Sequence, residues 1–300
     1  MSAALAVAPP ALRPRRIGFR YWLGLWAVDA VSLLVFVVRR LRATPPDVRI
    51  LVYHDVIAAR PADDPYRMTV PPALFDRHMA FLRRAGYHCV TVAQALDLLQ
   101  RDAVPGRSVV VTFDDGYVSM LSAAAPVLAR HAVPATLFVA AGHVGAPAFA
   151  WNGAAGPFTR PLRWDELHAL RDQITLEIGS HTVTHRPLQE LDPAEQDHEL
   201  ALSRGELETR LGQPVRVFAY PFGGWDTFPD DVRGRVRAQG YAAACANVMG
   251  ANTAATDRFA LRRVRIGWND TLWRFRLKLA GAYDWSDRLR RVLAGRSEKV

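Results

Sequence analysis

The sequence predicts an α/β fold, a distorted (β/α)7-type barrel with an apolar helix before it and an amphipathic helix after it. From Arg49 onward, short apolar runs that end in polar or glycine-containing turns alternate with segments of helical periodicity. Most of these runs are apolar at nearly every position, as strands buried on both faces of a parallel sheet are. About seven such strands in one domain suggest a barrel.

The elements of the barrel follow from these patterns. Two of the helices are expected at Phe75–Ala85 and at Pro193–Leu211, where Asp192 precedes a proline at the first helical position. The predicted strands are Arg49–Asp55, Ser108–Asp114, Ala135–Ala141, Thr175–Ser180, Val215–Tyr220, Ala242–Asn247 and Leu261–Ile266.

Changes in composition divide the chain into three parts. Residues 1–44 hold an apolar helix, and the two prolines that follow cannot continue it. Residues 45–270 hold the barrel. Residues 271–300 place apolar side chains at helical spacing with many arginines between them, which predicts a basic amphipathic helix over Leu272–Leu293.

The apolar run Tyr21–Val38 allows three interpretations. The first is an uncleaved membrane anchor, although its eighteen residues are near the lower limit of length for spanning a bilayer. Asp29 would raise the free energy of insertion by about 2.5–3.5 kcal/mol at the bilayer centre. The run could instead lie on a membrane or on the protein body, or the true start could follow it. Because the C-terminal basic helix would also suit anionic lipid, we predict association with a membrane of the cell envelope, in undecided orientation.

Charge and cysteine content exclude other classes. The net charge is +9, but 38 basic against 29 acidic residues is a modest excess spread along the chain. Without a zinc-finger or aromatic RNA-binding motif, this excess does not predict a nucleic-acid partner. The two cysteines, Cys89 and Cys245, lie in apolar surroundings and are expected to be core residues rather than a disulfide or a metal pair.

Two segments that follow predicted strands carry residues suited to a metal. Asp114 and Asp115 follow an apolar run, where two adjacent carboxylates are costly unless they have cationic partners or bind a metal. A solvated turn would explain an isolated Asp-Asp-Gly segment equally well. His181 and His185, four residues apart, would meet on one face of a helical turn. Together with Asp115 they form a set of two histidines and one carboxylate, which leaves positions open for water and substrate.

A third segment breaks from a strand into a Pro/Gly turn at Ala219-Tyr220-Pro221-Phe222-Gly223. Such a turn can expose backbone N–H groups that stabilise an oxyanion, although a simple strand-ending turn explains it equally well.

These three segments, in this order and at these intervals, resemble the motifs of the NodB-homology polysaccharide deacetylases, carbohydrate esterase family 4. The resemblance covers roughly Arg49 to Trp268. It implies that Asp114 is the catalytic base, that Asp115, His181 and His185 bind a divalent metal, with Zn2+ expected, and that the Phe222 N–H stabilises the oxyanion. It also implies a substrate that is an N-acetylated glycan.

The sequence departs from the common family pattern in two places. Ala219 stands where an arginine usually orients the base, and the usual C-terminal Leu-x-His motif is absent. The early Tyr53-His54-Asp55 segment resembles the branch of exopolysaccharide deacetylases with circularly rearranged motifs, in which a first-strand histidine is the acid. That resemblance assigns the acid to His54.

The missing arginine is expected to come from the last strand. Arg263 is the best candidate, with Arg262 and Arg265 as alternatives, and a surface or packing role for Arg263 is equally open.

The predicted function is therefore metal-dependent removal of N-acetyl groups from a polysaccharide or glycoconjugate that contains N-acetylhexosamine. Two alternatives stay open at this point, hydrolysis of a small non-sugar amide and a non-catalytic envelope scaffold. The complete set of two aspartates and two histidines weighs against the scaffold, because a dead domain has no chemical need for all four.

Overall fold

A computed structural model describes residues 19–41, 46–58, 64, 67–149, 159–287 and 289 of the chain. Seven parallel strands form a nearly closed barrel in the order β7-β6-β5-β4-β3-β1-β8. The strands of this ring are β1 (Val48–Tyr53), β3 (Ser108–Phe113), β4 (Ala135–Val139), β5 (Leu176–Ser180), β6 (Val217–Ala219), β7 (Ala243–Cys245) and β8 (Arg263–Arg265). The predicted fold class is confirmed, and each of the seven predicted strand segments forms a strand.

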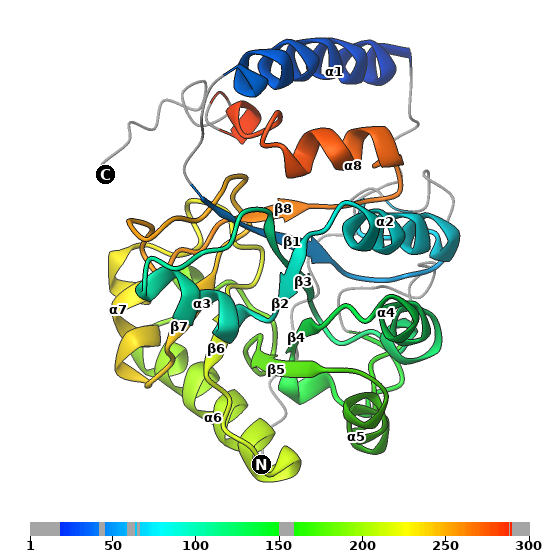
Figure 1. Ribbon diagram of the computed structural model, residues 1–300. Coiled ribbons are helices and arrows are strands. Elements are labelled where there is room, and N and C mark those ends of the chain that lie inside the picture. The colour runs from blue at the N-terminus through cyan, green and yellow to red at the C-terminus, as the bar shows by residue number, and fades with distance from the viewer. Residues whose placement is uncertain are drawn as a thin grey trace.

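Helices surround the ring on the outside (Figure 1). Besides the terminal helices α1 (Phe19–Arg40) and α8 (Leu272–Leu279), they are α2 (Pro72–Arg84), α3 (Val92–Gln100), α4 (Ala125–His131), α5 (Trp164–Gln173), α6 (Pro193–Leu211) and α7 (Asp230–Ala238). Short turns of other helix types span Met120–Ala124, Ala141–His143 and Leu188–Glu190. Helix α6 has the predicted bounds, because Asp192 caps the first turn and Gly212 ends the helix in the left-handed conformation.

The strand β1 is the centre of one side of the barrel. It pairs in parallel with β3 along its whole length and with β8 on its other edge, and all six of its residues are buried. This burial on every face explains why its sequence is apolar without alternation. The ring closes between β7 and the segment that leads into β8. There Cys245 of β7 and Leu261, two residues before β8, form a parallel bridge.

The structure adds one strand that the sequence analysis did not predict. The strand β2 (His88–Val90) pairs with the first half of β3, on the edge whose second half pairs with β4. Only one of its three residues is fully buried, so it lacks the long apolar run that marks the other strands.

The two terminal helices form an extra layer on one side of the barrel. Helix α8 lies outside β8 and β1, and α1 lies outside α8 (Figure 1). The predicted C-terminal helix is interrupted: α8 ends at Leu279, and Gly281 turns the backbone into the left-handed region before the chain is helical again at residues 285–287 and 289. Residues 288 and 290–293 of the predicted helix lie outside the described part. No helix in the described part of the chain, α1 included, combines the length and the apolar character that crossing a bilayer requires.

Candidate active site

The predicted site residues gather at one end of the barrel because the strands are parallel. His54 follows β1, Asp114 and Asp115 follow β3, and His181 follows β5. The carboxyl ends of parallel barrel strands lie at a common edge, so these side chains come together although up to 127 residues separate them in sequence.

The carboxylate of Asp114 is held by Arg263. Both side chains are buried, and the guanidinium makes two hydrogen bonds to the carboxylate, of 2.6 and 2.7 Å. A third hydrogen bond runs from Arg263 Nε to the carbonyl oxygen of Ala246. Burial is the largest single influence on the pKa of Asp114 and would raise it, but the charge and hydrogen bonds of Arg263, together with the nearby His181 and His54, outweigh burial and lower this pKa to about 2. Asp114 is therefore ionised and fixed in orientation.

Of the three arginines that the sequence offered for this role, only Arg263 reaches Asp114. The guanidinium of Arg262 lies over the ring of Trp225, and that of Arg265 pairs with Asp287. Strand alternation explains the case of Arg262, because successive side chains of a strand point to opposite faces. Arg265, two residues after Arg263, has the same parity and is instead held by Asp287.

The neighbouring carboxylate, Asp115, faces two imidazoles. His181 Nε2 lies 3.6 Å and His185 Nε2 lies 3.4 Å from the same carboxylate oxygen, Oδ1. One potential ligand atom from each of the three residues falls within 4.8 Å of the others. The structure therefore assembles the predicted set of two histidines and one carboxylate.

This arrangement fits a divalent cation. Both oxygens of Asp115 are buried, and neither accepts a well-formed hydrogen bond within the described structure, although the Tyr117 hydroxyl is close enough to affect the carboxyl. Burial, with the nearby charge of Asp114, raises the pKa of Asp115 well above its usual value. A cation between these groups would restore the ionised carboxylate and satisfy its oxygens.

One of the two histidines is already oriented as a ligand. His181 Nδ1 donates a hydrogen bond of 2.7 Å to the carbonyl oxygen of Ala219, which leaves Nε2 as the acceptor that faces Asp115. Burial lowers the pKa of His181 and that of His185, so both imidazoles are held in the neutral form that binds metals.

Strained backbone positions concentrate at the site. Asp115, Thr182, His185 and Phe222 all have φ between 61° and 72°, a region that costs a non-glycine residue on the order of 1–3 kcal/mol. The left-handed Thr182 also means that the two histidines do not share a helical turn, contrary to the sequence-based expectation. They lie on a loop that brings their Nε2 atoms together instead.

A residue that the sequence analysis missed holds this loop in place. The Glu199 carboxylate, which α6 supplies, accepts hydrogen bonds from the backbone N–H groups of Val183 and Thr184 and from the Thr184 hydroxyl. These bonds fix the chain between the two histidines. Nothing near Glu199 in the sequence indicates this role, since it comes from another element and looks like an ordinary helix residue.

His54 stands at the edge of the site. Its Nε2 lies 4.0 Å from Asp114 Oδ2, and its side chain is partly exposed. Burial lowers the pKa of His54 to about 4, against the opposing attraction of the Asp114 carboxylate. The imidazole is therefore neutral near pH 7, whereas the acid role that the resemblance assigns to His54 requires it to carry a proton when the amine departs.

A further buried carboxylate, that of Asp55, supports the strand end next to His54. Asp55 accepts hydrogen bonds from the backbone N–H and the hydroxyl of Thr159, and its own backbone pairs with the segment around Thr69. These bonds tie a loop from a distant part of the chain to the end of β1.

Phe222 lies beside His185. Its ring is 56% exposed, and its centroid is 5.2 Å from that of His185. The predicted role concerns its backbone N–H, and that role stays a prediction.

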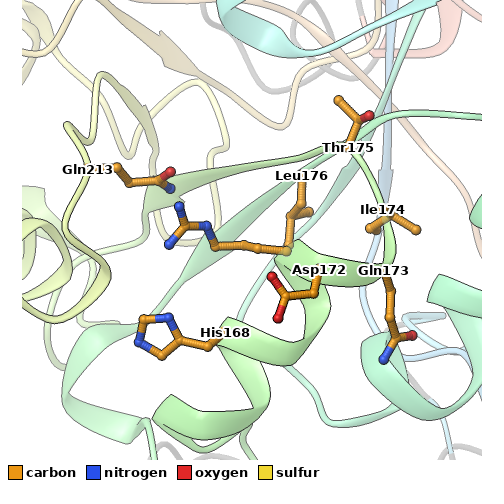
Figure 2. Close-up of a pocket in the computed structure, with 8 residues that line it drawn as sticks. His168, Asp172, Gln173, Ile174, Thr175, Leu176 and Gln213 are labelled. Atoms are coloured by element: carbon orange, nitrogen blue, oxygen red, sulfur yellow. The ribbon is translucent and has the colours of Figure 1, made fainter.

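A hollow of about 750 Å³ lies apart from this site, around the end of α5 and the start of β5 (Figure 2). His168, Asp172 and Gln213 are among the residues that line it. Because β5 runs from Leu176 to Ser180, the hollow is at the opposite end of the strand from His181, and we assign it no part in the chemistry of the site.

The first prediction concerns Glu199. Glu199→Gln keeps the size of the side chain but removes the charge that holds the histidine loop, so we expect divalent-metal affinity to fall by about 10–100-fold, the usual cost of losing such support. Competition with a chromophoric chelator measures this affinity. Glu206→Gln, two turns along the same helix, is the matched control and should leave it unchanged. Equal affinity in both variants would refute the role of Glu199.

Comparison with known proteins agrees with the geometry. The profile of the polysaccharide deacetylase family matches residues 101–244, which include the two aspartates, the two histidines and Phe222 but neither His54 nor Arg263. YxkH of Bacillus subtilis, named as a polysaccharide deacetylase, is 27% identical over 223 residues, which cover 74% of this chain and 72% of that protein.

Solved structures show the same fold. The deacetylase PplD of Streptococcus pyogenes superposes with a TM-score of 0.68 at 24% identity, covering 79% of this chain and 99% of that one. IcaB from Ammonifex degensii superposes with a TM-score of 0.62 at 25% identity, covering 79% of this chain and 97% of that one. The circular rearrangement of the motifs stays a prediction. Residues 101–244 thus match the polysaccharide deacetylase family, and with the curated relative and the IcaB structure this match identifies a polysaccharide deacetylase domain of the NodB-homology, carbohydrate esterase 4 type within this chain.

Proposed function

We propose that the protein is a divalent-metal hydrolase that removes N-acetyl groups from a polysaccharide or glycoconjugate containing N-acetylhexosamine. The observation that carries this proposal is the close placement of two differently held carboxylates. Asp114 is fixed and ionised by Arg263, while Asp115 faces two neutral histidines. Neighbouring carboxyls with opposite pKa shifts are typical of sites that use one group for proton transfer and the other for a separate task.

Asp115, His181 and His185 would hold the metal. Two imidazole nitrogens and one carboxylate oxygen form a ligand set that zinc accepts in hydrolytic sites, and Zn2+ is the metal we propose. When bound, the metal would make a water molecule acidic and polarise the acetyl carbonyl.

Asp114 would receive the proton of the attacking water. Its pKa of about 2 makes it a weak base, so it can act only on water whose own acidity has been raised. The two hydrogen bonds from Arg263 keep the carboxylate in one orientation and prevent it from turning towards the metal ligands. The guanidinium is thus a positioning group in this proposal.

His54 would carry the proton onward. Because its imidazole is neutral before the reaction, its proton has to come from the water by way of Asp114, whose oxygen lies 4.0 Å away. Water addition to the acetyl carbon releases one proton, and cleavage of the C–N bond consumes one at the departing amine. The transfer therefore balances, with acetate and a free amino sugar as products. The backbone N–H of Phe222 is proposed to stabilise the oxyanion.

The two alternative functions receive less support. The family relationship favours a carbohydrate over a small non-sugar amide. The exposed ring of Phe222 and the partly exposed His54 lie beside the metal ligands, an arrangement that an extended substrate can reach from solvent. The close arrangement of the two aspartates and the two histidines argues against a non-catalytic scaffold.

The second prediction tests this function directly. The purified full-length protein, supplied with Zn2+, should release acetate and free amines from N-acetylglucosamine oligomers, and removal of the metal with a chelator should abolish this activity until Zn2+ is restored. Acetate and primary amine assays run together measure the reaction. Activity that a chelator leaves unchanged would refute the metal-dependent mechanism, and hydrolysis of small cyclic amides alone would refute the carbohydrate substrate.

The third prediction concerns His54. His54→Ala should lower kcat by about 100-fold or more, because the departing amine loses its proton donor, while bound metal stays at the wild-type level. Steady-state kinetics and elemental analysis of the same preparations provide the two readouts. His88→Ala, an exposed histidine on β2, is the control and should behave as wild type. A normal kcat in His54→Ala would exclude this residue as the donor.

A further inference from the structure

The helix α1 has its polar and apolar faces reversed relative to a normal surface helix. The two polar side chains within its apolar run, Asp29 and Ser32, face the protein. Ser32 is completely buried and accepts a hydrogen bond from the indole N–H of Trp285. A helix on the surface of a soluble domain normally points such residues to water and its apolar residues inward.

Asp29 fixes the rotation of α1 about its axis. Its carboxylate accepts hydrogen bonds from the guanidinium of Arg274, on α8, at 2.5–3.2 Å and from the Tyr283 hydroxyl at 2.5 Å. Both charged side chains are largely buried, so separating them would leave a buried charge without its partner. The ion pair therefore keeps the opposite face of α1 directed away from the protein.

That opposite face is apolar. Trp26 is 73% exposed, Leu34 65% and Leu41, just after the helix, 83%. Four further exposed apolar side chains of α1 continue the same surface: Val31, Leu33, Val37 and Val38. Trp273 is exposed on the adjoining α8. A continuous apolar surface of this kind on the outermost helix indicates contact with something other than water.

We propose that this outer face of α1, together with Trp273, rests on the surface of an anionic lipid bilayer. The surrounding sequence supplies matching charge, since residues 1–46 contain seven arginines and a single acidic residue, Asp29, whose charge faces the protein and Arg274. Exposed tryptophans such as Trp26 and Trp273 suit the boundary between lipid chains and headgroups. A helix with leucine and tryptophan on its outer face and arginines near its ends has the composition of one that lies in the plane of a membrane.

The geometry favours a helix on the membrane over one that crosses it. Along its inner side α1 packs on α8 and forms the Asp29–Arg274 ion pair, and both would have to be lost for the helix to be surrounded by lipid. The proposal concerns the location of the protein and does not depend on the deacetylase activity.

The fourth prediction tests this surface with vesicles. Full-length wild type should sediment with vesicles of phosphatidylcholine and phosphatidylglycerol and less with phosphatidylcholine alone, and high salt should weaken the binding. The triple variant W26S/L34S/L41S should bind at least about tenfold more weakly, because the apolar face no longer enters the lipid. Leu202→Ser, which changes an exposed leucine on α6, should bind as wild type does. Thermal unfolding of each variant checks that the fold is intact.

Fluorescence quenching and ultracentrifugation distinguish a helix on the bilayer surface from a helix across the bilayer and from a dimer interface. The fluorescence of Trp26 is obtained as the difference between wild type and Trp26→Phe. Brominated lipids should quench this fluorescence more strongly when the bromine lies near the headgroup than when it lies near the end of the acyl chain. Stronger quenching by deep bromine would place α1 across the bilayer and overturn the proposal. Unchanged vesicle binding by the triple variant would also overturn the proposal. So would ultracentrifugation that finds the wild type to be a dimer without affinity for vesicles and the triple variant to be a monomer.

Discussion

Two adjacent buried carboxylates at the end of β3 set the main constraint on this structure. Asp114 and Asp115 are both nearly inaccessible to solvent, and two negative charges cannot stay next to each other there without positive partners. Arg263 neutralises the first. The second faces the neutral imidazoles of His181 and His185, and a cation between these groups would stabilise its ionised form. The chemistry of the site follows from this asymmetry.

The barrel provides these partners because of how it closes. Pairing of β8 with β1 carries Arg263 to the inside of the ring, where its guanidinium reaches across to the residue that follows β3. The histidine loop follows β5, and Glu199 of α6 fixes it from the outside. Several left-handed backbone positions at the site are costly in isolation, and these hydrogen bonds to neighbouring elements help to hold them.

Much of the fold could be predicted from the sequence, since strands buried on both faces leave long apolar runs. The short, half-exposed β2 leaves no such run and was missed. The grouping of Asp115, His181 and His185 could be predicted because their motifs are local. For Arg263 the sequence left three arginines open, and only the structure distinguishes them. The contacts of Glu199 and the Asp55–Thr159 contact could not be predicted, because each joins two different segments of the chain, 15 and 104 residues apart, without a local pattern.

The protonation state of His54 and the orientation of α1 could also not be predicted from the sequence. The first depends on how many atoms surround the imidazole, which is a property of packing. For α1, the run of apolar residues is compatible with a core helix, a membrane helix or an interfacial one. The contact of Asp29 with Arg274 shows which face is turned inward, and thereby which side chains face outward.

The most direct test of the central claim, that the two aspartates have separate tasks, is the metal content of two isosteric variants measured beside their deacetylase activity. We expect Asp114→Asn to retain about one divalent metal per chain and to lose nearly all activity, and Asp115→Asn to lose both metal and activity. Elemental analysis after loading with Zn2+ and gel filtration gives the metal content, and thermal unfolding identifies any variant that fails to fold. A folded Asp115→Asn protein that still binds metal as wild type does would contradict the assignment.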